Sequence, residues 1–110
     1  AKIARARGRR SEAAKILESI VRADGTQGDA LLELARHHRD VGNKEKALLM
    51  LERAAKLEAY EYRALVEQAQ FQVSAREYEK AAALLKSALR IQEEPRVERF
   101  LARVEEAARR

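Results

Sequence analysis

The residues of this chain that could do chemistry are few and scattered. His37 and His38 form the one histidine pair, and side chains of neighbouring helical residues point about 100° apart, so the two rings cannot easily bind one metal. The sequence has no cysteine that could add a ligand. No recognisable base or orienting group accompanies the hydroxyl residues Ser11, Thr26, Ser74 and Ser87. We therefore predict no enzyme, no metal, no cofactor and no small-molecule substrate.

A basic cluster opens the chain and accounts for the formal net charge of +5. Its members are Lys2, Arg5, Arg7, Arg9 and Arg10. Taking these five from the 23 basic residues leaves 18, which balance the 18 acidic residues of the chain. Only this end of the chain could therefore contact nucleic acid. The interpretation of the basic cluster that we favour is a solvated helix end.

The composition predicts helices throughout. Apolar residues make up 46% and charged residues 37% of the chain, which has one Pro and four Gly. The longest apolar runs have five residues (47–51 and 81–85), whereas a membrane-spanning helix needs about 20. We expect a soluble protein without a membrane span, of undetermined compartment. Because the chain begins with Ala, any targeting segment is expected to have been removed or to lie in a longer parent.

Two stretches of apolar periodicity define the first helices. We expect a short helical piece over 1–7, a break at Gly8, and a helix from Ser11 whose apolar stripe consists of Ala13, Ile16, Leu17, Ile20 and Val21. The next stripe, up to the turn at Gly42, consists of Leu31, Leu34, Ala35, His38 and Val41.

An internal repeat organises the rest of the chain. Residues 28–61 superimpose on 62–95 without a gap, and most of the pattern of 45–54 returns 34 residues later in 79–88. Small residues recur where two helices are expected to approach closely, at Ala35, Ala47, Ala69 and Ala81. The larger Leu51 and Leu85 are expected to fill the space beside them.

This pattern resembles the tetratricopeptide repeat (TPR) family, which has 34-residue repeats of two antiparallel helices. The resemblance implies an all-α fold, an α-solenoid forming a right-handed superhelix, as one domain of a longer TPR protein. Its parts would be a partial repeat (1–27), two repeats (28–61 and 62–95) and a capping helix (96–110). The sequence departs from the family pattern where Leu31 and Leu65 replace a large aromatic residue, where Ala35 and Ala69 replace Gly, and in having its Pro only at Pro95.

The resemblance also implies a scaffold that binds a peptide or helix of a partner protein on a concave face lined by the first helix of each repeat. By register, the residues on this face are Asp29, Leu32, Glu33, Arg36, Arg39, Arg63, Val66, Glu67, Gln70 and Val73. Leu32, Val66 and Val73 are either exposed anchors for a partner or ordinary surface residues. The family's carboxylate clamp is absent, because its positions hold Leu32, Arg36, Glu67, Val97 and Leu101.

A structural role is the alternative function. If the chain begins inside a repeat, Ile3, Ile16 and Ile20 would expose a face that a preceding repeat covers in a longer solenoid. The chain would then be a spacer, or a self-assembly segment that forms a homo-oligomer through this N-terminal face. The preference for Ala and Arg indicates a GC-rich, bacterial genome.

Overall fold

The computed structural model describes the backbone of residues 2–24 and 27–110, and the side chains of residues 9–24 and 27–110. The chain divides into two compact units, Ala1–Leu57 and Glu58–Arg110. No helix in the described ranges is long and apolar enough to cross a bilayer.

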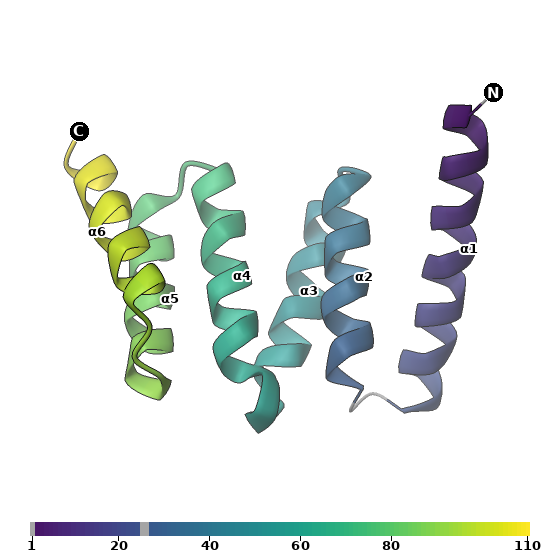
Figure 1. Ribbon diagram of the computed structural model, residues 1–110, viewed down its shortest axis with the longest axis horizontal. Helices are drawn as coiled ribbons and strands as arrows, with labels where there is room; N and C mark the ends of the chain where they lie inside the picture. Colours follow the sequence, from purple (N-terminus) through teal and green to yellow (C-terminus); the bar gives the residue numbers. More distant parts are fainter. Residues whose placement is uncertain (1, 25–26) are drawn as a thin grey trace. The chain divides into compact units, whose positions relative to one another are not determined.

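The first unit contains the helices α1 (Lys2–Ala23), α2 (Gly28–Asp40) and α3 (Lys44–Ala55). Helix α2 packs against both α1 and α3 (Figure 1). It therefore buries side chains around a wide arc, namely Ala30, Leu31, Leu32, Leu34, Ala35 and His38. From α3, Ala47, Leu51 and Ala54 are buried. The exposed fraction of Ala47 is 0%, which confirms the small residue expected at the close approach.

Helix α1 differs from the expectation in two ways. Its 22 residues run through Gly8 without a break, so the predicted interruption is wrong. A helical Gly costs only about 1 kcal/mol relative to Ala. The buried side chains are those of Ala14 and Val21, whereas Ile16 is 62% and Ile20 40% exposed. The exposure expected for these two isoleucines is confirmed, and Ile3 lies outside the described side chains.

The second unit contains a 3-10 turn, Glu58–Tyr60, and the helices α4 (Glu61–Ser74), α5 (Tyr78–Ile91) and α6 (Pro95–Arg109). Helix α5 packs against both α4 and α6 (Figure 1). The buried core between these helices consists of Ala69, Ala81, Ala82, Leu85, Val97 and Val104. The predicted roles of Ala69, Ala81 and Leu85 are confirmed, since all three are 0% exposed.

The same turn joins the helices of each pair. After α2, Gly42 has φ of 82°, its N–H donates to the Arg39 carbonyl at 3.1 Å, and the Asn43 N–H donates to the His38 carbonyl at 2.7 Å. After α4, Arg76 has φ of 61°, with equivalent bonds from Arg76 to Val73 at 3.0 Å and from Glu77 to Gln72 at 2.8 Å. These are Schellman turns, in which a left-handed residue ends the helix. Val41, expected in the core, lies at this helix end and is 63% exposed.

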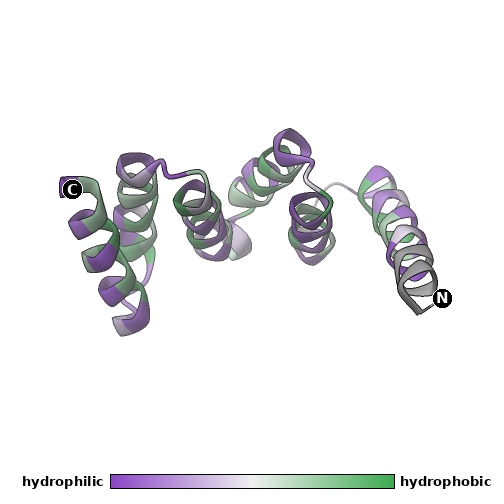
Figure 2. Cartoon of the chain, turned by 90° about the horizontal axis from the view of Figure 1, so that it is seen from above, coloured by the Kyte–Doolittle hydropathy of each residue, from purple (hydrophilic) through white to green (hydrophobic). Residues whose placement is uncertain are grey.

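The expected fold class is confirmed: the described residues form α-helices in antiparallel pairs and include no strand. Figure 2 shows apolar and polar residues on every helix, as amphipathic helices require. The division into repeats at 28–61 and 62–95 stays a prediction.

Candidate functional site

The predicted binding residues of α2 separate into one buried and four exposed side chains. Asp29, Glu33, Arg36 and Arg39 are exposed. Leu32 is only 1% exposed, so the expectation of an exposed anchor at this position is wrong. The reason is that α2 has neighbours on two sides and buries Leu32 as well as the adjacent Leu31. The exposed α2 set is therefore entirely charged.

The predicted residues of α4 include three that meet in one groove. Val66, Gln70 and Val73 follow one another at helical spacing, and all three line a hollow of about 480 Å³. Arg63 lies apart from it, with its guanidinium carbon 6.0 Å from the centre of the Tyr60 ring. Glu67 is half-buried and does not line the hollow.

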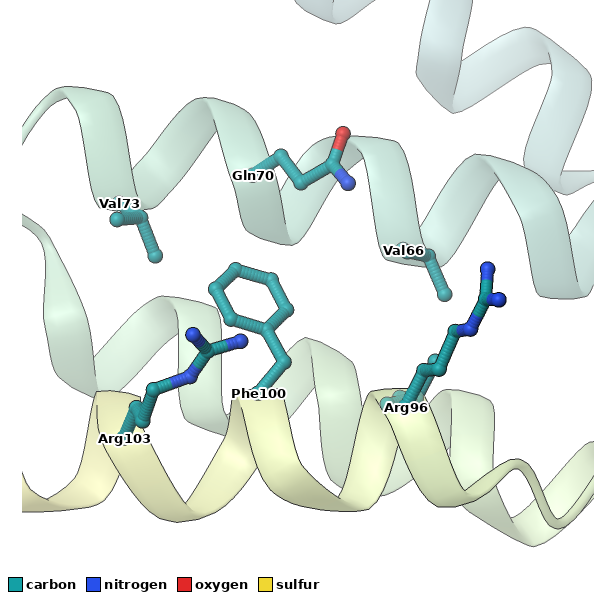
Figure 3. A pocket seen from close by; sticks show the side chains of 7 residues that line it. Val66, Gln70, Val73, Arg96, Phe100 and Arg103 are labelled. Carbon is teal, nitrogen blue, oxygen red and sulfur yellow. The ribbon is translucent and has the colours of Figure 1, made fainter.

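The opposite wall of this hollow comes from α6. We call the hollow the α4–α6 groove and define it by its lining residues, which are Val66, Gln70, Val73, Arg96, Val97, Phe100 and Arg103. In Figure 3 the Phe100 ring projects from α6 toward α4, with Arg96 and Arg103 on either side of it along the helix. Phe100 and the valines make the floor apolar, and the two guanidinium groups add positive charge at its edge.

Local sequence fixes the start of α6 and thereby its register against α4. Pro95 occupies the first turn, where its missing N–H costs no hydrogen bond. Glu94 is the N-cap, and its Oε1 accepts a hydrogen bond from the Arg96 N–H at 3.4 Å. From this start, Arg96, Phe100 and Arg103 fall at steps of four and three residues, so they lie along one side of α6.

The arginines of the groove are available to a ligand. Both side chains are exposed, and in the part of the chain that the structure describes neither forms an ion pair. An apolar floor beside unpaired arginines is the chemistry of a protein-binding hot spot, since aromatic and Arg side chains dominate such sites. The groove can bury an apolar side chain of a ligand, and its two arginines can form ion pairs with acidic residues beside that side chain.

Sequence reasoning identified the α4 wall of this groove and missed the α6 wall. The last helix was predicted only as a capping helix over 96–110. The signal that could have found the missing wall is the spacing of Arg96, Phe100 and Arg103, which places two positive charges beside an aromatic residue on one helix face.

The histidine pair occupies a structural position. His38 is 8% exposed, as its place in the predicted apolar stripe indicated, and His37 is half-exposed; their ring centroids lie 5.4 Å apart. Burial lowers the pKa of His38, and the neighbouring His37 and Lys46 lower that pKa further.

No group of three metal-ligating side chains occurs within the described residues. Of the hydroxyl residues, Thr26 lies outside the described residues, and Ser74 Oγ donates to the Gln70 carbonyl at 3.2 Å.

Comparison with known proteins gives a structural likeness. No family model matches the sequence, and no curated protein matches it. One similar solved structure is that of the Yersinia enterocolitica type III secretion chaperone SycD in complex with a peptide of the translocator YopD. The alignment covers 91% of this chain and 77% of the SycD chain, with a TM-score of 0.71 and 20% sequence identity. At this identity the likeness shows the fold, which is the TPR-like all-helical fold.

Proposed function

We propose that this chain is a non-enzymatic interaction scaffold that binds a peptide or a helix of a partner protein in the α4–α6 groove. The observation that carries the proposal is an apolar floor of Phe100, Val66 and Val73 beside two arginines. Neither Arg96 nor Arg103 forms an ion pair with a described residue. The SycD structure, which holds a peptide of YopD, supports peptide binding as a use of this fold.

The groove determines what the partner segment must carry. Burying one Leu-sized side chain on the floor contributes about 1.5–3 kcal/mol. Exposed ion pairs contribute less, about 0.2–1 kcal/mol each, but they steer association and reject basic partners. We therefore infer a segment with one large apolar residue beside acidic residues.

Charge reversal of the groove tests this proposal. The probe is a fluorescein-labelled helical peptide with Glu at two positions seven apart and Leu four residues after the first, and the comparison peptide carries Lys in place of both Glu. Fluorescence anisotropy should show that R96E/R103E weakens binding of the Glu peptide at least about tenfold, since 1.4 kcal/mol is tenfold in affinity. The Lys peptide should gain affinity for the same variant.

The matched control is R90E/R99E, with one substitution on α5 and one on α6. It changes the net charge of the protein by the same amount as R96E/R103E but leaves the groove lining intact. This control should bind the Glu peptide like the original protein at moderate salt, where distant charges are screened. Equal losses in both double variants, or no preference for the Glu peptide, would show that the groove is not the site.

The exposed charges of α2, in the first unit, and of α4, in the second unit, are proposed as further binding residues, each within its own unit. Charge reversal at Arg36 and Arg63 should weaken binding of a longer acidic or amphipathic partner without unfolding the domain. If reversal of Arg96 and Arg103 alone affects such a partner, binding is confined to the α4–α6 groove.

A structural role is the second candidate, and the exposed Ile16 and Ile20 favour it. In this role a preceding repeat, or a second copy, would cover that side of α1. The substitutions I16K/I20K should then abolish any association made through α1, as light scattering would detect. Nucleic-acid contact through the basic first ten residues is a third candidate. It predicts an affinity that falls steeply with salt and disappears when Arg5 to Arg10 are removed.

A further inference from the structure

Helix α3 carries a large apolar side chain that the described residues leave half exposed. Leu49 is 51% exposed, although Leu is usually buried on an amphipathic helix. Glu45 lies four residues before it and Glu52 three residues after it, and both are exposed. We call these three residues the α3 stripe. Because steps of four and three return to one side of a helix, the α3 stripe presents an apolar side chain beside two carboxylates.

The α4–α6 groove has the complementary arrangement. Arg96, Phe100 and Arg103 repeat the same steps of four and three along α6, with positive charges where the α3 stripe has negative ones. In each triplet the outer charges are seven residues apart, which is about 10.5 Å along a helix axis. A helix lying along the groove would thus bring both carboxylates to both guanidinium groups at once.

From this match we propose that the α3 stripe of one copy docks into the α4–α6 groove of a second copy. Leu49 then contacts the floor formed by Phe100, Val66 and Val73. Lys46 and Arg53 lie on the other side of Leu49 from the two glutamates. When the glutamates face α6, Lys46 and Arg53 therefore face Gln70 of α4.

A second copy suits this groove because the pattern is specific to one helix of the chain. Among the described side chains, the other exposed large apolar residues are Ile16, Ile20, Val41 and Ile91. None of these four residues is flanked by two acidic residues at spacings of four and three, in either order. Of these exposed residues, only Leu49 fits the two arginines.

The contact joins two different surfaces, and each copy offers one stripe and one groove. Association therefore gives open chains, closed rings or, where both contacts form reciprocally, a two-fold dimer. The proposal rests on the groove of the proposed function, with the second copy as the ligand.

Complementary charge swaps in the full-length chain test the proposal by sedimentation velocity over a concentration series. The original protein should associate. The variants E45R/E52R and R96E/R103E should each weaken association at least about tenfold. An equimolar mixture of the two variants should restore it, because the basic stripe of the first fits the acidic groove of the second and their unmodified surfaces also match.

Controls separate this mode from general charge effects and from misfolding. E12R/E79R and R90E/R99E carry matched charge changes at exposed positions outside both surfaces and should associate like the original protein. Restoration in the mixture also shows that both swapped variants are folded. L49A should weaken association and leave the circular dichroism spectrum unchanged.

Three results would overturn the inference: an original protein that stays monomeric at every concentration, a mixture that fails to regain association, or association that only I16K/I20K abolishes. Its failure is distinguishable from failure of the proposed function. E45R/E52R keeps an intact groove, so it should still bind the labelled Glu peptide even if the protein does not self-associate.

Discussion

The two Schellman turns predict opposite effects of exchanging their left-handed residues. Gly42 and Arg76 occupy the same place after α2 and α4, with φ of 82° and 61°. A left-handed conformation costs an L-residue roughly 1–2 kcal/mol, whereas Gly adopts it freely. Arg76→Gly should therefore relieve strain in the second unit, and Gly42→Arg should introduce it in the first.

The net effect is smaller than the strain because Gly also stabilises the unfolded chain. The unfolded chain has more conformations with Gly than with another residue, and losing them on folding lowers the free energy of unfolding by about 0.4–1 kcal/mol. The difference leaves Arg76→Gly stabilising by about 0.5–1 kcal/mol and Gly42→Arg destabilising by a similar amount. A Cβ at Gly42 would meet no atom within 4 Å, so the cost there is conformational rather than steric.

Urea unfolding followed by circular dichroism measures both changes. The control is Ala75→Gly, one residue before Arg76, where φ is −85° and Gly brings only its entropic cost of about 0.4–1 kcal/mol. If Arg76→Gly destabilises the protein as much as Ala75→Gly does, the left-handed strain is not what limits this turn, and the reasoning is refuted.

Three further predictions concern the core. Leu51→Ala and Leu85→Ala should each cost about 2–5 kcal/mol in urea unfolding, because these side chains are 3% and 0% exposed, whereas Leu49→Ala should cost about 0.5 kcal/mol or less. Lowering the pH below 6.5, the ordinary pKa of His38, should reduce the free energy of unfolding, because the lowered pKa lets the unfolded chain bind the proton first; His38→Gln should remove this dependence and His37→Gln should retain it. Tyr62→Phe should stabilise the second unit by about 1 kcal/mol in thermal unfolding, because Tyr62 Oη is buried and makes no hydrogen bond with a described residue; a loss of stability would mean that the hydroxyl is satisfied.

The sequence was sufficient to predict those features that one helix pair determines. Close approach of two helices requires small side chains, so the Ala residues at positions 47 and 81 could be assigned to the core without coordinates. Similarly, α6 begins at Pro95, one residue before the start of the capping helix expected over 96–110. The short-range rules of helix geometry cover both cases.

Features that depend on a third helix could not be predicted. Leu32 lies off the predicted apolar stripe of α2, and it is buried in a unit where α2 packs against both α1 and α3. The α6 wall of the groove was missed for the same reason, since Arg96 and Arg103 gain their meaning only beside α4. Gly8 was over-interpreted, because an isolated Gly weakens a helix without ending it.

Phe100 has a consequence for finding the partner. Its ring packs against the core of the second unit and also lines the groove, so a ligand that covers it adds to the stability of the fold. By mass action, a ligand at about 100 times its Kd raises the free energy of unfolding by roughly 2.7 kcal/mol. A thermal-shift screen can therefore rank unlabelled peptides of any sequence by their effect on the melting temperature, and loss of the shift in R96E/R103E would assign each hit to the groove.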